Sequence, residues 1–110
     1  MMAQQDWGNG PTDVTALVDY QDGAIVSRTL VKERAGTVTA FAFDAGQALS
    51  EHTTPFDALL QVVDGLAQVV VGGTGHRLQA GQMMRLPANV PHSVTAERRC
   101  KLLLVMIRAQ

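Results

Sequence analysis

The chain has 110 residues, enough for one domain with a single hydrophobic core. Hydrophobic residues make up 46% of it, which excludes a disordered chain, and nine basic against ten acidic residues give a net charge of −1. The sequence has neither a broad basic face for nucleic acid nor an apolar run long enough to cross a membrane, so we expect a cytoplasmic protein with neither as a partner.

The chain is predicted to begin with an N-terminal arm, residues 1–23, followed by the main domain, residues 24–110. Glycine and proline interrupt residues 1–13, which carry no apolar period. Residues 13–20 are ambiguous. Their apolar side chains fit a helical turn and a half, and a short edge strand fits them nearly as well.

The main domain reads as short runs of apolar and β-branched residues separated by turn signals. Asp64-Gly65 is a strong turn dipeptide, and Pro87 and Pro91 bound a loop because proline cannot donate a ladder hydrogen bond. Cys100, the only cysteine, precedes an apolar run and is expected to be a buried, inert thiol. Roughly eight to ten short strands without a long helix predict an all-β sandwich or barrel. The predicted strands are residues 24–31, 37–43, 58–63, 67–71, 76–78, 83–86, 93–96 and 102–107.

Two stretches combine glycine, proline and histidine at fixed distances. Five residues separate the glycine from the histidine in the first stretch, and five separate the glycine from the proline in the second. The anchoring residues are Gly46, His52 and Gly65 in the first and Gly81, Pro87 and His92 in the second. Both stretches resemble the two conserved motifs of the cupin superfamily, and with their flanking strands they are similar to a small single-domain protein of the cupin 2 conserved barrel type.

The resemblance implies a small antiparallel β-barrel or jelly roll, also called a double-stranded β-helix. Small cupins of this type are commonly homodimers that pair or exchange N-terminal strands, a role that the arm before Ala24 would suit. In metal-binding cupins, the first motif supplies two histidines and a glutamate, and the second supplies one histidine, to a single divalent metal. The matching positions in this chain are His52, Thr54, Ala58 and His92.

Two of these four positions depart from the pattern. Thr54 offers only a neutral hydroxyl, and Ala58 offers no ligand. Metals such as Zn, Fe, Mn and Ni favour three or four imidazole or carboxylate ligands, so we expect a degenerate site that holds one divalent metal weakly or not at all. Asp57 and His76 are weaker candidates for a further ligand. Strand alternation turns Asp57 away from Ala58, and the position of His76 relative to His52 depends on strand register.

The sequence favours a protein that binds a small molecule in the barrel pocket, beside a degenerate metal site of His52 and His92. A small barrel can hold one small ligand in its mouth. The candidate pocket residues are Thr54, Ala58, Leu60, Val62, Met84 and Leu86. A metal-dependent enzyme acting on a small organic substrate, dioxygenase-like or isomerase-like, is the alternative. Metal-free acid–base catalysis by the two histidines is a third hypothesis, so the sequence leaves open whether the protein is an enzyme.

Overall fold

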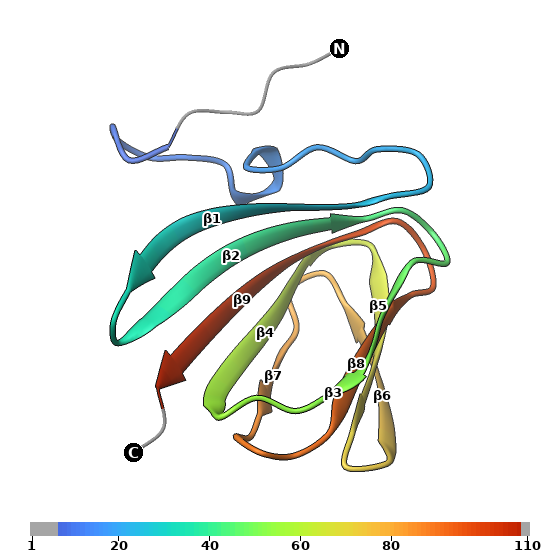
Figure 1. Ribbon diagram of the computed structural model, residues 1–110. Coiled ribbons are helices and arrows are strands. Elements are labelled where there is room, and N and C mark those ends of the chain that lie inside the picture. The colour runs from blue at the N-terminus through green and yellow to red at the C-terminus, as the bar shows by residue number, and fades with distance from the viewer. Residues whose placement is uncertain (1–6, 109–110) are drawn as a thin grey trace.

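The computed structural model describes residues 7–108 and folds them into two antiparallel sheets (Figure 1). One sheet has the strand order β1-β2-β9-β4-β7 and the other β3-β8-β5-β6. This arrangement confirms the predicted all-β barrel of the jelly-roll type. The elements are η1 (Val14–Ala16), β1 (Ile25–Glu33), β2 (Gly36–Phe43), β3 (Ala48–His52), β4 (Phe56–Asp64), β5 (Leu66–Val71), β6 (Thr74–Gln79), β7 (Met83–Leu86), β8 (His92–Ala96) and β9 (Cys100–Arg108). Within residues 7–108, no helix has the length and apolar character that crossing a membrane requires.

Eight of the nine strands overlap a strand predicted from the sequence; the exception is β3. The side chains of β3 are mostly exposed, and only Leu49 packs against the core. Its sequence therefore lacks the apolar alternation that predicts a strand. It becomes one by pairing with β8, with a register shift between Leu49 and His52.

The inside of the barrel is filled by alternate side chains of both sheets. On β9, for example, Leu102 and Leu104 pack inward while Leu103 packs on the outer side. Cys100 is fully buried, as expected, and this burial raises the pKa of its thiol to about 11. The buried inner cluster comprises Phe43, Ala58, Leu60, Val62, Ala67, Val69, Leu78, Leu86, Val94, Ala96, Cys100 and Leu102.

The described part of the N-terminal arm packs on the outer face of the five-stranded sheet. Residues 1–6 lie outside the described part. The ambiguous segment at residues 13–20 contains the short 3₁₀ turn η1, so the helical alternative is closer than the strand. Leu17 and Val18 are buried there against Ala40 and Ala42 of β2. Burial of two such aliphatic side chains contributes roughly 1.5–3 kcal/mol each, which makes this contact the main attachment of the arm.

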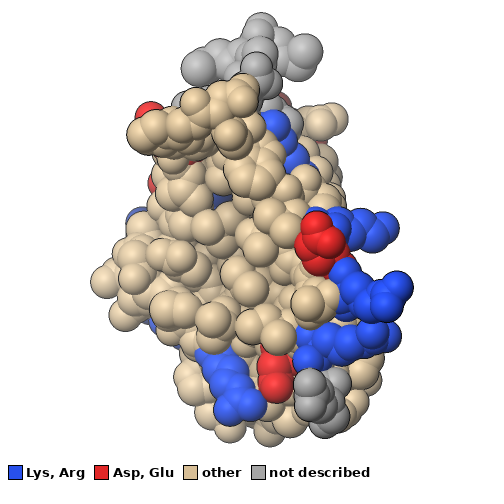
Figure 2. Space-filling view, turned by 90° about the vertical axis from the view of Figure 1, so that its left-hand side faces the viewer, with Lys and Arg blue, Asp and Glu red and all other residues tan. Residues whose placement is uncertain are grey.

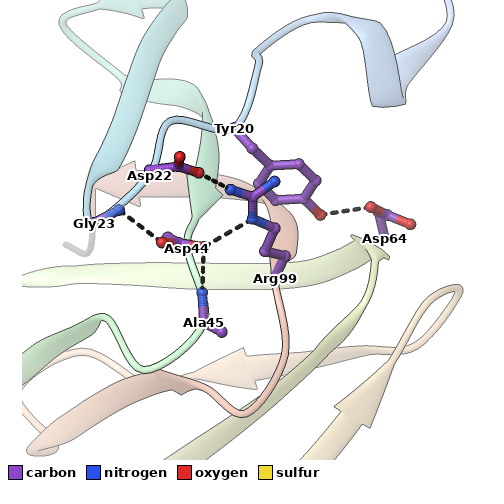
Figure 3. Close-up of polar contacts among 7 residues, drawn as sticks. All are labelled: Tyr20, Asp22, Gly23, Asp44, Ala45, Asp64 and Arg99. Carbon is purple, nitrogen blue, oxygen red and sulfur yellow. Dashed lines mark hydrogen bonds and ion pairs between the residues drawn. The ribbon is translucent and has the colours of Figure 1, made fainter.

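A polar cluster fixes the segment that joins the arm to β1 (Figure 3). Tyr20 Oη donates a hydrogen bond to Asp64 Oδ2 at 2.5 Å, and burial followed by this contact raises the tyrosine pKa. Arg99 Nε donates to Asp44 Oδ1 at 2.8 Å, and Arg99 Nη2 also pairs with Asp22. The cluster thus joins the arm to the β2–β3 and β8–β9 turns. Because these groups are largely exposed, each ion pair adds little stability.

Gly65→Ala should destabilise the fold severely. Gly65 lies in the β4–β5 turn at φ +81°, and a Cβ there would stand 1.8 Å from the Arg99 carbonyl oxygen. Gly73 is the matched control, because its φ is +84° and nothing lies within 4 Å of its Cβ position. Urea unfolding should show a loss of about 3 kcal/mol or more for Gly65→Ala and only about 1–2 kcal/mol for Gly73→Ala. Equal losses would contradict the close approach of the two turns.

Asp44 should contribute to stability only above acidic pH. The Gly23 N–H, the Arg99 side chain and the Ala45 N–H lower its pKa from 3.8 to about 2. A carboxyl whose pKa is lower in the folded state stabilises the fold above its unfolded pKa, and this contribution is lost as the pH falls through the folded pKa. The difference in unfolding free energy between wild type and Asp44→Asn should therefore be largest above about pH 4 and shrink towards pH 2. A difference independent of pH would contradict the assignment.

Candidate functional site

His52 and His92 meet where two neighbouring strands reach the same end of the barrel. His52 is the last residue of β3, His92 is the first of β8, and the two are paired across the strands. Antiparallel pairing brings the end of one strand opposite the start of the next. His92 is 8% exposed, whereas His52 is exposed, so the pair stands at the mouth of the barrel with one ring open to solvent.

The two rings face each other through their Nε2 atoms. These atoms are 3.1 Å apart, and the ring planes make an angle of 67°. The other nitrogen of each ring contacts a backbone carbonyl two residues earlier in the chain. His52 Nδ1 lies 2.8 Å from the Ser50 oxygen, and His92 Nδ1 lies 3.2 Å from the Val90 oxygen. Each ring is therefore held at its Nδ1 atom by the backbone.

These carbonyl contacts set the tautomer of each imidazole. A carbonyl oxygen only accepts hydrogen bonds, so each Nδ1 carries a proton and donates it. A neutral ring then has a bare lone pair at Nε2, and the two lone pairs face each other at 3.1 Å. Burial lowers the pKa of His92 and favours its neutral form. The Val90 carbonyl raises this pKa, and the charge of His52 lowers it further. The arrangement is favourable only when a cation, a metal ion or a proton, lies at the Nε2 atoms.

This donor set fits two ligands of a divalent metal. Metal-binding histidines usually donate their second N–H to a carbonyl or carboxylate, as both rings do here. Two nitrogens 3.1 Å apart, each roughly 2.0–2.1 Å from one ion, would subtend about 100° at it, between octahedral and tetrahedral angles. The described residues contain no group of three or more His, Cys, Asp or Glu side chains that could hold a metal. This part of the chain thus offers two of the three or four ligands that such a metal favours.

The two weaker metal candidates lie away from this pair. Asp57 Oδ1 accepts hydrogen bonds from the Ala88 N–H at 3.0 Å and from Arg85 Nη2 at 3.1 Å. The Ala88 N–H, followed by Arg85, lowers the pKa of Asp57, which stays ionised on the outer side of the barrel. His76 is exposed on β6, at the opposite edge of the sheet from β3. Three strand spacings of roughly 4.8 Å separate these two edges.

The positions of the missing ligands are occupied by groups that cannot replace them. Thr54 Oγ1 accepts a hydrogen bond from the Phe56 N–H and donates to the Phe56 carbonyl, both at 3.3 Å, which closes a local turn. Ala58 is 5% exposed and belongs to the inner cluster. Within residues 7–108, the site therefore has no carboxylate that would offset the charge of a divalent ion.

The cavity beneath the histidines is small. It measures about 30 Å³, room for one or two water molecules. Of the predicted pocket residues, Leu60 and Leu86 line it. Val62 is fully buried elsewhere in the core, and Met84 packs half-buried against that core. The remaining lining residues, which the sequence reasoning missed, are Phe41, Leu49, Val94, Leu102 and Leu104.

A signal for some of these missed residues was present in the sequence. Residues two apart on a strand share a face, so Val94 had to lie on the side of His92. Leu49 carries no such signal, because the register shift in β3 breaks the alternation before His52.

A larger hollow, about 450 Å³, lies at the other end of the barrel, where the β4–β5, β6–β7 and β8–β9 turns meet. Arg77 and Arg98 border it, and Arg77 Nη2 is bound to Glu97 Oε2 at 2.9 Å. This hollow is broad and open, with exposed lining groups, and it shares no residue with the cavity under the histidines. The chemistry of the histidine pair therefore belongs to the small cavity.

Several solved structures are similar to this chain. A conserved protein of unknown function from Streptococcus pyogenes is 30% identical, with a TM-score of 0.90 over 96% of this chain and 92% of that one. A cupin 2 conserved barrel domain protein from Leptotrichia buccalis is 38% identical, with a TM-score of 0.82 over 84% of this chain. This chain spans 45% of the Leptotrichia protein's length. No curated protein matches.

More distant structures share the fold. A cupin superfamily protein from Desulfitobacterium hafniense is 20% identical, with a TM-score of 0.88 over 93% of this chain and 94% of that one. The family model described as the cupin domain matches residues 40–106, which include both histidines and most of the barrel strands. The match, the two antiparallel sheets and the paired histidines agree, and the chain belongs to the cupin family.

Proposed function

We propose that this protein binds a small anionic organic molecule through one divalent metal ion held by His52 and His92. The observation that carries this proposal is the pair of facing Nε2 atoms, 3.1 Å apart, whose rings are fixed by backbone carbonyls. The ion would supply a Lewis-acidic centre with open positions. His52 and His92 hold it and orient it, and the exposed ring of His52 leaves it accessible from solvent.

The chemical class of the small molecule follows from what the site lacks. Two neutral imidazoles leave the full charge of a divalent ion uncompensated, and protein sites usually add a carboxylate. Here the small molecule supplies that carboxylate. Because the cavity below the histidines is only about 30 Å³, the bound molecule sits at the mouth, above Leu60 and Leu86, and not inside the barrel.

A metal-dependent enzyme of the dioxygenase or isomerase type is the second candidate function. The open side of His52 favours it, since a catalytic metal keeps positions free for substrate. The common arrangement for such chemistry has two histidines and one carboxylate. Asp57 is turned outward and bound to Arg85, so the described residues do not provide the third ligand. The binding function therefore fits the residues better.

Metal binding should depend on two of the three histidines. Untagged protein, stripped of metal, should take up about one Zn(II), Ni(II), Mn(II) or Fe(II) ion per chain in equilibrium dialysis followed by elemental analysis. His52→Ala should weaken this binding at least about 100-fold, because a single imidazole cannot hold the ion. His76→Ala is the matched control and should leave the affinity unchanged, since His76 lies at the far sheet edge. Uptake that is equal in both variants would refute the metal site.

A chelating carboxylate should tighten metal binding. In titration calorimetry, metal affinity should rise by about tenfold or more with oxalate or glycolate present, because each supplies the missing carboxylate. Propanediol, which lacks a carboxylate, is the control. In the His52→Ala variant, oxalate should leave the melting temperature of the protein unchanged. Oxalate that stabilises wild type and variant equally would indicate binding elsewhere, for instance between Arg77 and Arg98.

A further inference from the structure

A short loop, residues 87–91, carries the backbone carbonyl that holds the ring of His92. The loop joins β7 to β8, and its Val90 oxygen lies 3.2 Å from His92 Nδ1. Pro87 and Pro91 bound the loop and have no N–H to donate. The position of the Val90 carbonyl, and with it the proton on His92 Nδ1, therefore depends on the contacts that hold this loop.

The loop contains a backbone conformation that needs support from its surroundings. Asn89 has a φ of +64°, in the left-handed region, and is the one residue other than glycine with a positive φ in the described part of the chain. Such a conformation costs on the order of 1 kcal/mol even for asparagine, and it persists only where neighbouring contacts fix the chain.

The segment that follows the other histidine supplies this support. Residues 53–57 lead from the end of β3 into β4, and they lie beside the loop at the lower end of the barrel in Figure 1. The Asn89 N–H donates to the Thr54 carbonyl at 2.8 Å. The Ala88 N–H donates to Asp57 Oδ1 at 3.0 Å. The acceptor of the first bond is backbone and that of the second is a side chain, so the second bond can be removed by substitution.

The bond from Ala88, and not the ion pair with Arg85, is the contact through which Asp57 acts on the loop. Arg85 Nη2 lies 3.1 Å from the same oxygen, and the side chains of Arg85 and Asp57 are 66% and 40% exposed. Figure 2 faces the end of the molecule where β4 begins, and charged side chains of both signs lie beside one another along its border. Exposed ion pairs of this kind add about 0–1 kcal/mol. The Ala88 N–H, by contrast, is part-buried and is the largest cause of the lowered pKa of Asp57.

We propose that Asp57 is a positioning residue for the histidine site. Through the Ala88 N–H, it keeps the loop in the conformation that presents the Val90 carbonyl to His92. The proton of that ring then stays on Nδ1, and the lone pair of Nε2 stays free for a cation. Asp57 itself does not touch the cation. That the cation is a metal ion rests on the proposed function, whereas the effect on the ring belongs to the metal-free protein.

The tautomer of His92 in the metal-free protein is the first readout. Nitrogen-15 NMR at about pH 8, where imidazole is neutral, distinguishes a proton on Nδ1 from one on Nε2, and His92→Ala assigns the signals among the three histidines. The wild type should show the Nδ1–H form. Asp57→Leu and Asp57→Ala should let the ring divide between its two neutral forms, because the loop is no longer held. Asp57→Asn should keep the wild-type form, since its amide oxygen can accept the Ala88 N–H.

The affinity for Zn(II), measured by equilibrium dialysis, is the second readout. Asp57→Leu and Asp57→Ala should raise the dissociation constant about tenfold or more, as loss of a group that orients a ligating histidine does. Asp57→Asn should change it less than about threefold. Arg85→Gln is the matched control, because it removes the ion pair and leaves the Ala88 bond, and it should behave like Asp57→Asn. Circular dichroism checks that each variant folds, and Asp57→Ala, the smaller change, serves if Asp57→Leu does not.

The outcomes separate this inference from the proposed function. A His92 tautomer that stays unchanged in Asp57→Leu and Asp57→Ala would overturn the inference, whatever metal the protein binds. An Asp57→Asn variant that binds zinc as weakly as Asp57→Leu would also overturn it, because the charge of Asp57 and not its bond to the loop would then be responsible. A wild type that binds no zinc, while its His92 tautomer still follows the substitutions at Asp57, would contradict the proposed function and support this inference.

Discussion

Burial of the inward-facing side chains of the two sheets holds this barrel closed. The positions of the other features of the molecule depend on this closure. Leu60, Leu86 and Leu102 meet from three different strands and leave a cavity of only about 30 Å³. The same closure brings the end of β3 beside the start of β8. The histidines consequently lie against packed apolar side chains of the core. This packing fixes the histidine backbone and leaves free space only on the solvent side of the rings. Ligand chemistry at this site is confined to the mouth.

The histidine pair combines preorganisation with incomplete coordination. The Ser50 and Val90 carbonyls hold the Nδ1 atoms, and both Nε2 lone pairs are aimed at one point. Two facing lone pairs repel each other without a cation. A metal ion or a proton at the Nε2 atoms would remove this repulsion. The loss of a carboxylate at Ala58 changes what such a centre can do. Without that carboxylate the residues offer no negative charge to retain a metal, and in the proposed function a bound anion supplies it.

Strand alternation also decides which side chains lie on the outer surface of the five-stranded sheet. Val38, Val105 and Leu59 lie opposite one another on this face, next to the charged side chain of Arg85. The arm covers one half through Leu17 and Val18. The polar contacts around Arg99 fix the course of the chain from the arm to β1. Beyond that contact, Val31 and Leu59 are exposed on the strands of this sheet.

The sequence by itself determined the all-β class, eight of the nine strands and the two histidines, because apolar alternation, Asp-Gly turns and motif spacing are local signals. It did not reveal β3, whose side chains are mostly exposed, nor Leu49 in the cavity wall, because the register shift before His52 breaks the alternation. Only the tertiary structure decided that the Nε2 atoms face each other, that Asp57 turns to Arg85, and that the arm covers half a sheet. These outcomes depend on contacts between residues far apart in the chain, and such contacts leave no periodic signal in a single sequence.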